Sequence, residues 1–313
     1  GAQTTTTTTT NPTTPATPSS VPKGGGCGKG AAPGSRALTV RLGGLARTVI
    51  VHVPVGYSAR ARVPLVLNLH GSGSTAAQQE VFTGMDGEAD LAGFIVAYPQ
   101  AKILNGTGFD WNIAGVPLAQ GAKEPAHPVD DVAFLSLLVG NLERRYCVNS
   151  ARVYVTGFSG GARMASELAC DDSNIFAAVA PVSGLRKPDP CPSVRSMPIL
   201  SFHGTADPID PYGGNGQPYW TYSVPAALKD WAAQDECHGG PVTTRPGPGV
   251  TLTRYGHCPG KAVVELDTIS GEGHEWPGGP PLPARLTKVL GPQSDVIDAD
   301  AIMWSFFSAH PLR

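Results

Sequence analysis

A serine enclosed by glycines is the first feature of the sequence that could perform a reaction. Residues 157–161 read Gly-Phe-Ser-Gly-Gly. The β-branched run at 153–155 before them indicates a buried strand, and residues 162–169 after them favour a helix. A Gly-x-Ser-x-Gly turn between strand and helix is typical of a nucleophile elbow, which is so tight that side chains on its outer glycines would strike the neighbouring strand and helix. We therefore predict that Ser159 is a nucleophile at a helix N-terminus.

An acid and a base follow the serine in the order that such a mechanism needs. Asp207 comes directly after a predicted strand at 198–202, and His274 follows another at 262–269. We expect His274 to take the seryl proton and return it to a leaving alcohol, while Asp207 orients the imidazole. Asp210 is a competing acid three residues further on. Asp207 is preferred because it lies nearer the end of a rigid strand.

The segment Leu-His-Gly-Ser-Gly at 69–73 ends an earlier apolar strand and can complete an oxyanion hole. Such a hole needs one N–H group from the residue after the nucleophile and another from this loop. We predict the Gly160 and Ser72 N–H groups, with Gly71 as the alternative to Ser72. His70 is interpreted as a structural, hydrogen-bonded histidine, because only His274 has the position in the chain that a base requires.

Aromatic residues gather in the long loops and beside the serine. Flat rings in loops suit the binding of aromatic or sugar rings, although each ring could instead anchor its loop to the core. The substrate-binding candidates are Trp111, Phe158, Trp220, Tyr222 and Trp276. We find no metal or cofactor motif, and the Asp130-Asp131 pair is interpreted as a helix N-cap rather than a metal site.

The elements around these residues alternate between strands and helices. Apolar runs at 64–70, 94–98 and 176–182 predict buried strands, with helical patterns between them. This alternation predicts an α/β fold with a mostly parallel central sheet and helices on both faces, preceded by an antiparallel hairpin within 38–53. Gly/Pro-rich loops at 103–129, 211–222 and 239–260 are expected over the C-terminal edge of the sheet, where such folds bind ligands.

Composition limits the possible partners. The chain has 313 residues, 23 Lys or Arg against 25 Asp or Glu, and a net charge of −2. The absence of a basic block argues against nucleic acid and anionic membrane surfaces as partners. The sequence contains no run of about 18 apolar residues, so it predicts no membrane-spanning helix.

Two regions divide the sequence. Residues 1–26 hold a run of threonines followed by Pro/Thr/Ser repeats, which predicts a disordered, semi-rigid linker. Residues 27–313 read as one catalytic domain. In secreted proteins such a linker more often separates a catalytic domain from a binding module, so we expect a binding module to have been lost beyond the N-terminal linker.

Six dispersed cysteines without a Cys-x-x-Cys pair predict three disulfides and an extracellular location. Six cysteines allow many pairings. The favoured pairing joins Cys237 to Cys258 and Cys170 to Cys191, each pair bracketing one loop region, which leaves Cys27 for Cys147. The start at Gly1, without initiator Met or signal peptide, fits a mature, processed or recombinant form.

Taken together, the motifs at 69–71, 157–161, 202–208 and 273–278 resemble those of a known group. These are the secreted serine esterases known as polyhydroxybutyrate depolymerase-like proteins, or as feruloyl and acetyl xylan esterases of carbohydrate esterase family one. The resemblance runs from about residue 35 to residue 312. It implies an α/β-hydrolase fold, no cofactor, and an ester substrate on a polysaccharide or polyester.

The sequence departs from this group at two places. Gly160 stands where many members have Asn or Asp, and Glu272 stands where many have a small residue. With Glu275, it makes the histidine loop acidic, which favours neutral or cationic substrates. We expect a secreted feruloyl esterase that releases hydroxycinnamates from plant cell walls. The alternatives are a polyester depolymerase, an acetyl xylan esterase, or a non-catalytic binding protein of the same fold.

Overall fold

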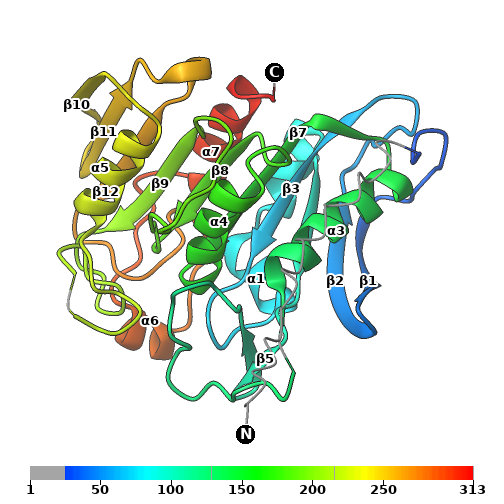
Figure 1. Cartoon of the computed structure of the whole chain (residues 1–313), viewed down its shortest axis with the longest axis horizontal. Coiled ribbons are helices and arrows are strands. Elements are labelled where there is room, and N and C mark those ends of the chain that lie inside the picture. Colours follow the sequence, from blue (N-terminus) through cyan, green and yellow to red (C-terminus); the bar gives the residue numbers. More distant parts are fainter. Residues whose placement is uncertain (1–24, 128, 215, 313) are drawn as a thin grey trace, which may run out of the picture.

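The structure, a computed structural model, describes residues 25–127, 129–214 and 216–312. The predicted linker therefore lies outside the described residues, apart from its last two. Within the described chain, one sheet of ten strands has the order β1-β2-β4-β3-β7-β8-β9-β12-β11-β10 (Figure 1). Their bounds are β1 (Gly34–Leu42), β2 (Leu45–Val53), β4 (Ile95–Pro99), β3 (Val63–Leu69), β7 (Val148–Phe158), β8 (Ala178–Val182), β9 (Ile199–Gly204), β12 (Val264–Ile269), β11 (Val250–Gly256) and β10 (Gly239–Gly247).

The strand pairs between β4 and β12 are all parallel, and the pairs outside them at both edges are antiparallel. A short separate hairpin is formed by β5 (Ile103–Asn105) and β6 (Gly108–Asp110). The antiparallel β1–β2 hairpin at one edge confirms the prediction for residues 38–53. The parallel centre explains why β3, β4 and β8 are almost entirely apolar, because helices cover both of their sides.

Helices cover both faces of the sheet, which confirms the predicted fold class (Figure 1). One face carries α3 (Asp131–Arg145), α4 (Gly160–Asp171) and α5 (Val224–Gln234). The other carries α1 (Ala76–Thr83), α2 (Asp86–Ala92) and α7 (Ala299–Ala309). The surface helix α6 (Ala284–Leu290) and a 3-10 turn (Pro259–Lys261) complete the described helices.

Alternate side chains of β3 belong to the hydrophobic cores on opposite faces of the sheet. Leu65, Leu67 and Leu69 belong to the hydrophobic cluster beneath α3 and α4. Val66 belongs to the cluster beneath α1, α2 and α7. Successive side chains of a strand point to opposite faces, so a continuous apolar run supplies both layers.

The start of α3 confirms the interpretation of the aspartate pair. The Asp130 carboxylate accepts the Ala133 N–H at 2.8 Å and caps the helix. Asp131 forms a buried ion pair with Arg47 of β2 and accepts the Asn112 N–H at 2.6 Å. The pair therefore begins the helix and ties it to the sheet.

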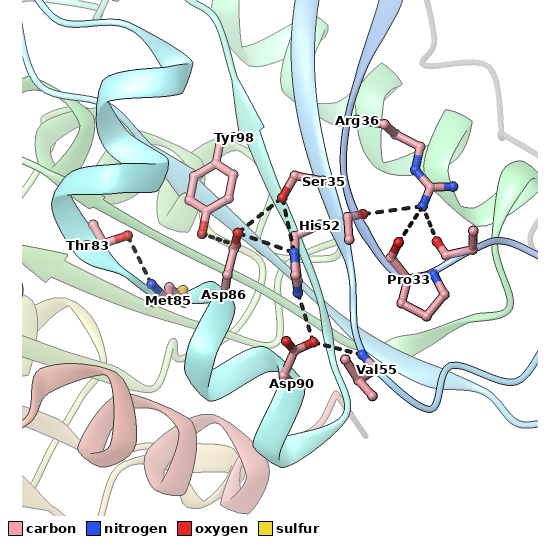
Figure 2. A network of polar contacts seen from close by, with 12 residues as sticks. Pro33, Ser35, Arg36, His52, Val55, Thr83, Met85, Asp86, Asp90 and Tyr98 are labelled. Atoms are coloured by element: carbon pink, nitrogen blue, oxygen red, sulfur yellow. Dashed lines mark hydrogen bonds and ion pairs between the residues drawn. The ribbon is translucent and has the colours of Figure 1, made fainter.

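A polar network fastens α2 to the β1–β2 edge (Figure 2). His52 lies with Nε2 2.9 Å from the Asp90 carboxylate and Nδ1 3.1 Å from the Ser35 hydroxyl. Tyr98 donates its hydroxyl to Asp86 at 2.7 Å. These contacts satisfy polar groups where the helix packs against the sheet edge.

Residues 239–260 differ from the prediction. They were expected as a loop, but they form β10 and β11, which extend the sheet by an antiparallel edge. Most side chains of β10 are exposed, so no hydrophobic alternation marks the strand in the sequence. Gly and Pro at its ends also conceal it.

All six cysteines form the three disulfides with the favoured pairing: Cys27–Cys147, Cys170–Cys191 and Cys237–Cys258. The first links the start of the described chain to the beginning of β7. Among the described residues, none of the helices has the length and apolar character needed to cross a bilayer.

Candidate active site

Ser159 occupies the turn between β7 and α4 with φ 53° and ψ −113°. A non-glycine residue adopts such a backbone only where its surroundings impose it. A Cβ atom at Gly157 would lie 2.6 Å from the Gly161 carbonyl carbon, and one at Gly161 would lie 2.6 Å from the His70 carbonyl oxygen. These contacts confirm that the outer glycines are required by the tightness of the turn.

The loops after β9 and β12 bring Asp207 and His274 together. His274 Nδ1 lies 2.7 Å from Asp207 Oδ2. The other carboxylate oxygen accepts the N–H groups of Ile209 and Asp210, both at 2.8 Å. Burial by itself raises the pKa of Asp207, but hydrogen bonds from His203 and His274 outweigh it and hold that pKa well below its usual value. The carboxylate is therefore ionised and fixed in orientation.

Asp210 has a different partner. Its Oδ2 atom accepts a hydrogen bond from the Arg163 guanidinium at 2.6 Å, and both side chains are buried. Arg163 belongs to α4, so this pair joins the acid loop to the helix that follows Ser159. Asp207, not Asp210, is the acid that reaches His274.

His203, the last but one residue of β9, is a member of the site that the sequence pattern did not single out. Its Nε2 lies 2.8 Å from the Asp210 carbonyl oxygen and 3.3 Å from Asp207 Oδ2. The ring stacks on Trp220 with centroids 5.7 Å apart. The signal available was its position four residues before Asp207, at the end of a buried strand.

Phe158 connects the elbow to the histidine loop. Its ring centroid lies 4.6 Å from that of His274 and 4.7 Å from that of Phe82. The residue before Ser159 therefore packs directly against the imidazole. Such a tilted pair limits how far the imidazole can turn.

The two N–H groups predicted for an oxyanion hole belong to adjacent segments. A Cβ atom at Gly160 would lie 3.1 Å from the Ser72 backbone nitrogen and would strike the Ser72 hydroxyl. The Ser72 side chain therefore occupies the space that a larger residue at 160 would need. A Cβ atom at Gly71 would lie 3.5 Å from that of Ser159, so the whole loop rests on the elbow.

His70 has a structural role, as predicted. Nδ1 lies 2.8 Å from the Gly71 carbonyl oxygen, and Nε2 accepts the Ala101 N–H at 3.1 Å. This pattern places the proton on Nδ1. Burial lowers the pKa of His70 to about 4, although the hydrogen bond to Gly71 raises it. A neutral imidazole with both nitrogens engaged cannot act as a base.

The three tryptophan rings proposed for substrate binding are buried, so they do not offer the open faces that the sequence led us to expect. Trp111 is 3% exposed, Trp276 is 1% exposed and Trp220 is fully buried. Each indole N–H finds a partner inside the molecule: Trp111 with the His70 carbonyl, Trp220 with the Pro211 carbonyl, and Trp276 with the Asp300 carboxylate. They anchor their loops, as buried tryptophans do when a hydrogen-bond acceptor lies within reach. Tyr222 is partly buried and packs on Trp220.

Two buried carboxyl groups flank His274. Glu272 is 1% exposed and Glu275 is fully buried, and within the described residues no hydrogen-bond partner contacts their carboxyl oxygens. Burial, together with the charges of Glu275 and Asp207, raises the pKa of Glu272 to about 8. Burial also raises the pKa of Glu275, to about 7, although the nearby His274 lowers it. Both groups therefore bind protons more tightly than exposed glutamates.

Comparison with known proteins relates this geometry to a family. The model of the family described as esterase PHB depolymerase matches residues 48–213. Feruloyl esterase B of Piromyces equi is 31% identical over 239 residues, which are 73% of this chain and 42% of that protein. Poly(3-hydroxyalkanoate) depolymerase C of Paucimonas lemoignei is 27% identical over 269 residues, which are 77% of this chain and 61% of that protein.

A solved structure supports the fold. The acetyl xylan esterase from Aspergillus awamori superposes with a TM-score of 0.58 at 16% identity, covering 84% of this chain and 94% of that one. The chain spans about two fifths to three fifths of the two relatives described above.

Proposed function

Because the chain belongs to the esterase PHB depolymerase family, we propose that Ser159, His274 and Asp207 form the catalytic triad of this carboxylesterase. The observation that carries the proposal is the 2.7 Å hydrogen bond between His274 and Asp207, on loops that meet beside the strained serine turn. The contact of Phe158 with both regions joins them. This order and arrangement of groups suits acyl transfer.

The reaction proceeds in two halves. Ser159 Oγ attacks the ester carbonyl carbon while His274 Nε2 takes the seryl proton. The N–H groups of Gly160 and Ser72 stabilise the oxyanion of the tetrahedral intermediate. The imidazolium then protonates the leaving alcohol, which leaves an acyl-serine. Water, deprotonated by His274, attacks the acyl carbon and releases the acid with return of the proton to Ser159.

Asp207 holds the proton of His274 on Nδ1, so that Nε2 is free to accept the seryl proton. His203 is a positioning residue for this acid, since its Nε2 lies within 3.3 Å of the same carboxylate oxygen. Two ring nitrogens, of His203 and His274, and two backbone N–H groups thus lie around one carboxylate. This keeps Asp207 ionised while His274 becomes charged.

We further propose that the substrate is a hydroxycinnamoyl ester on a plant cell-wall polysaccharide. The buried tryptophans do not support this assignment, but the Phe158–Phe82 pair beside His274 does. Phe82 is partly exposed and Phe158 is buried with 9% exposure, and a flat acyl group gains more from aromatic faces than a small aliphatic one. A relative named feruloyl esterase agrees with this choice. A polyester or an acetylated xylan is the alternative, favoured by the other two named proteins.

Two measurements test these proposals. In Ser159→Ala and in His274→Ala, the rate of p-nitrophenyl acetate hydrolysis should fall to the residual level of an enzyme that lacks a triad. In Asp207→Asn, the rate should fall by about 10⁴-fold. Wild-type activity in any of these variants would refute the triad.

For the acyl group, kcat/KM for methyl ferulate should exceed kcat/KM for ethyl butyrate, and Phe82→Ala should reduce the difference between the two values. Faster clearing of a polyhydroxybutyrate suspension than release of ferulate from arabinoxylan would favour the depolymerase.

We also propose that this esterase is secreted, that residues 1–26 are a linker, and that residues 27–313 form one catalytic domain. The three disulfides support secretion, because such bonds persist in oxidising compartments. The Thr/Pro composition supports the linker. Mass spectrometry of the secreted protein, with and without reduction, would detect the disulfides and any modification of the linker threonines.

A further inference from the structure

A positively charged groove lies far from Ser159. It has a volume of about 590 Å³ and lies between a first segment, residues 29–40, which enters and includes much of β1, and the C-terminal end of α3. Lys29 and Arg36 line it from the first segment, and Arg144 and Arg145 line it from the second. No Asp or Glu is among its lining residues. We call these four residues and the space between them the cationic groove.

The groove and the proposed nucleophile lie at opposite ends of β7. Tyr146, a lining residue, comes just before β7, and Ser159 comes just after it. β7 has 11 residues, and a strand rises about 3.3 Å per residue. The two sites are therefore separated by roughly 35 Å along the strand. The disulfide Cys27–Cys147 holds the first wall of the groove against this end of β7.

On the first wall, neutral groups hold the cations in place. Lys29 Nζ donates to the Arg144 carbonyl oxygen at 2.9 Å. The Arg36 guanidinium donates to the backbone carbonyl oxygens of Ala32, Pro33 and Gly34 (Figure 2). These partners orient the side chains but leave their charges uncompensated.

The second wall has the same property. Arg144 donates to the Asn141 side-chain oxygen at 3.1 Å, and the Arg145 guanidinium lies 5.9 Å from the centre of the Tyr146 ring. Glu143 directly precedes Arg144 in the sequence, but it is only 7% exposed and does not line the groove. Over residues 25–127, 129–214 and 216–312, no ion pair involves any cation of the groove.

The sequence explains how the charge accumulates. No Asp or Glu occurs before Glu80, although this stretch contains Lys29 and Arg36. The fold then brings the basic last turn of α3 to the same place. The helix dipole accounts for Arg144 and Arg145 at a C-terminus. It does not account for two further cations on a different segment.

We propose that the cationic groove binds a polysaccharide that carries carboxylates, such as uronic acid residues. The choice of a polysaccharide rests on the proposed function, and the charge of the groove selects the acidic kind. The groove has no exposed aromatic ring on which a nucleic-acid base could stack, because Tyr146 is buried. Its remaining lining includes small residues such as Gly30 and Ala31 rather than the large apolar side chains that enter a membrane.

Binding at this distance would hold the polymer without occupying the catalytic edge. A polysaccharide bound in the groove raises the local concentration of its own ester groups near Ser159. Recognition of the charged units and hydrolysis of the neutral ester are thereby separated.

The test uses the inactive Ser159→Ala protein and polygalacturonate that carries no esters, so its result does not depend on the proposed reaction. Binding is measured by titration calorimetry at low and high salt. The matched probe is the same polymer with its carboxylates reduced to alcohols. We expect binding of polygalacturonate that weakens with salt, and no comparable binding of the reduced polymer.

Two double variants with equal net charge locate the site. Lys29→Gln with Arg145→Gln removes two exposed cations from the groove. Binding of polygalacturonate should weaken about 25-fold at low salt, which is about fivefold for each charge. Arg245→Gln with Arg285→Gln removes exposed cations elsewhere, and affinity should stay within about twofold. In the background with Ser159 intact, neither pair should change hydrolysis of p-nitrophenyl acetate.

Three outcomes would overturn the proposal. Equal losses in the two double variants would mean that binding depends only on overall charge. Equal affinity for the polymer and its reduced form would mean that carboxylates are not recognised. Tighter binding to duplex DNA or to vesicles containing phosphatidylserine would assign the groove to another class of partner.

Discussion

The two buried glutamates beside His274 should make the stability of this protein depend on pH. Glu272 is the stronger test, because its carboxyl is 1% exposed and lacks a hydrogen-bond partner among the described residues. Glutamine has nearly the same shape but cannot ionise. We therefore predict that Glu272→Gln stabilises the protein at alkaline pH and has little effect in acid.

The direction follows from the raised pKa of Glu272. In the folded chain the group keeps its proton up to a pKa of about 8, whereas an exposed glutamate loses it near 4.5. Below pH 4.5 the group is neutral in both states, so its contribution to stability is fully present there. As pH rises from 4.5 to 8, the unfolded state alone releases the proton, and the folded state loses stability.

The magnitude comes from the same two values. A difference of one pH unit corresponds to about 1.4 kcal/mol, so the pKa values of about 8 and 4.5 imply a loss of at most about 5 kcal/mol above pH 8. The repulsion from Glu275 and Asp207 contributes part of this loss. For a chain of this size, such a gain in the variant corresponds to about 10 °C in Tm.

The assay is urea unfolding of wild type and Glu272→Gln at pH 4.5 and pH 9, with the disulfides intact. Glu124→Gln, which changes an exposed glutamate, is the control and should show no pH-dependent difference. A variant that is destabilised equally at both pH values would refute the reasoning. It would show that the carboxyl makes a required hydrogen bond in the folded protein.

Further substitutions test the packing of the site. Gly157→Ala should abolish soluble expression, because its Cβ would lie 2.6 Å from the Gly161 backbone, and native-like circular dichroism would contradict this. Asp210→Asn should reduce the free energy of unfolding by about 3 kcal/mol, since it leaves Arg163 buried without its charge partner, and urea unfolding measures the loss. His203→Leu should lower kcat by about tenfold or more with little change in KM, while His203→Gln should retain more activity because it keeps an N–H donor. Equal activity of the two His203 variants would exclude the positioning role.

Much of the fold was predictable because its signals are local. The apolar run of β3 and the turn at Ser159 depend on period and on steric limits that act over a few residues. The alternation of strands and helices then permits few topologies, since parallel strands need crossovers. The disulfide pairing was also predicted, although only as the favoured one of several.

Other features depend on contacts between distant segments, and sequence distance does not encode them. Asp207 and Asp210 occupy one short loop, and only the packing of Arg163 from α4 against Asp210 determines which carboxylate faces His274. The tryptophans are buried because carbonyl or carboxylate acceptors happen to lie within reach of their indole N–H groups.

The sequence by itself determined the residue types of the site, their order and the strands that carry them. Tertiary structure decided which of those residues touch, and it gathered charges whose sum in the sequence is nearly zero. Lys29 and Arg145 lie more than a hundred residues apart, yet both line one groove. Electrostatic interaction depends on distance in space, so a balanced composition can still fold into a strongly cationic surface.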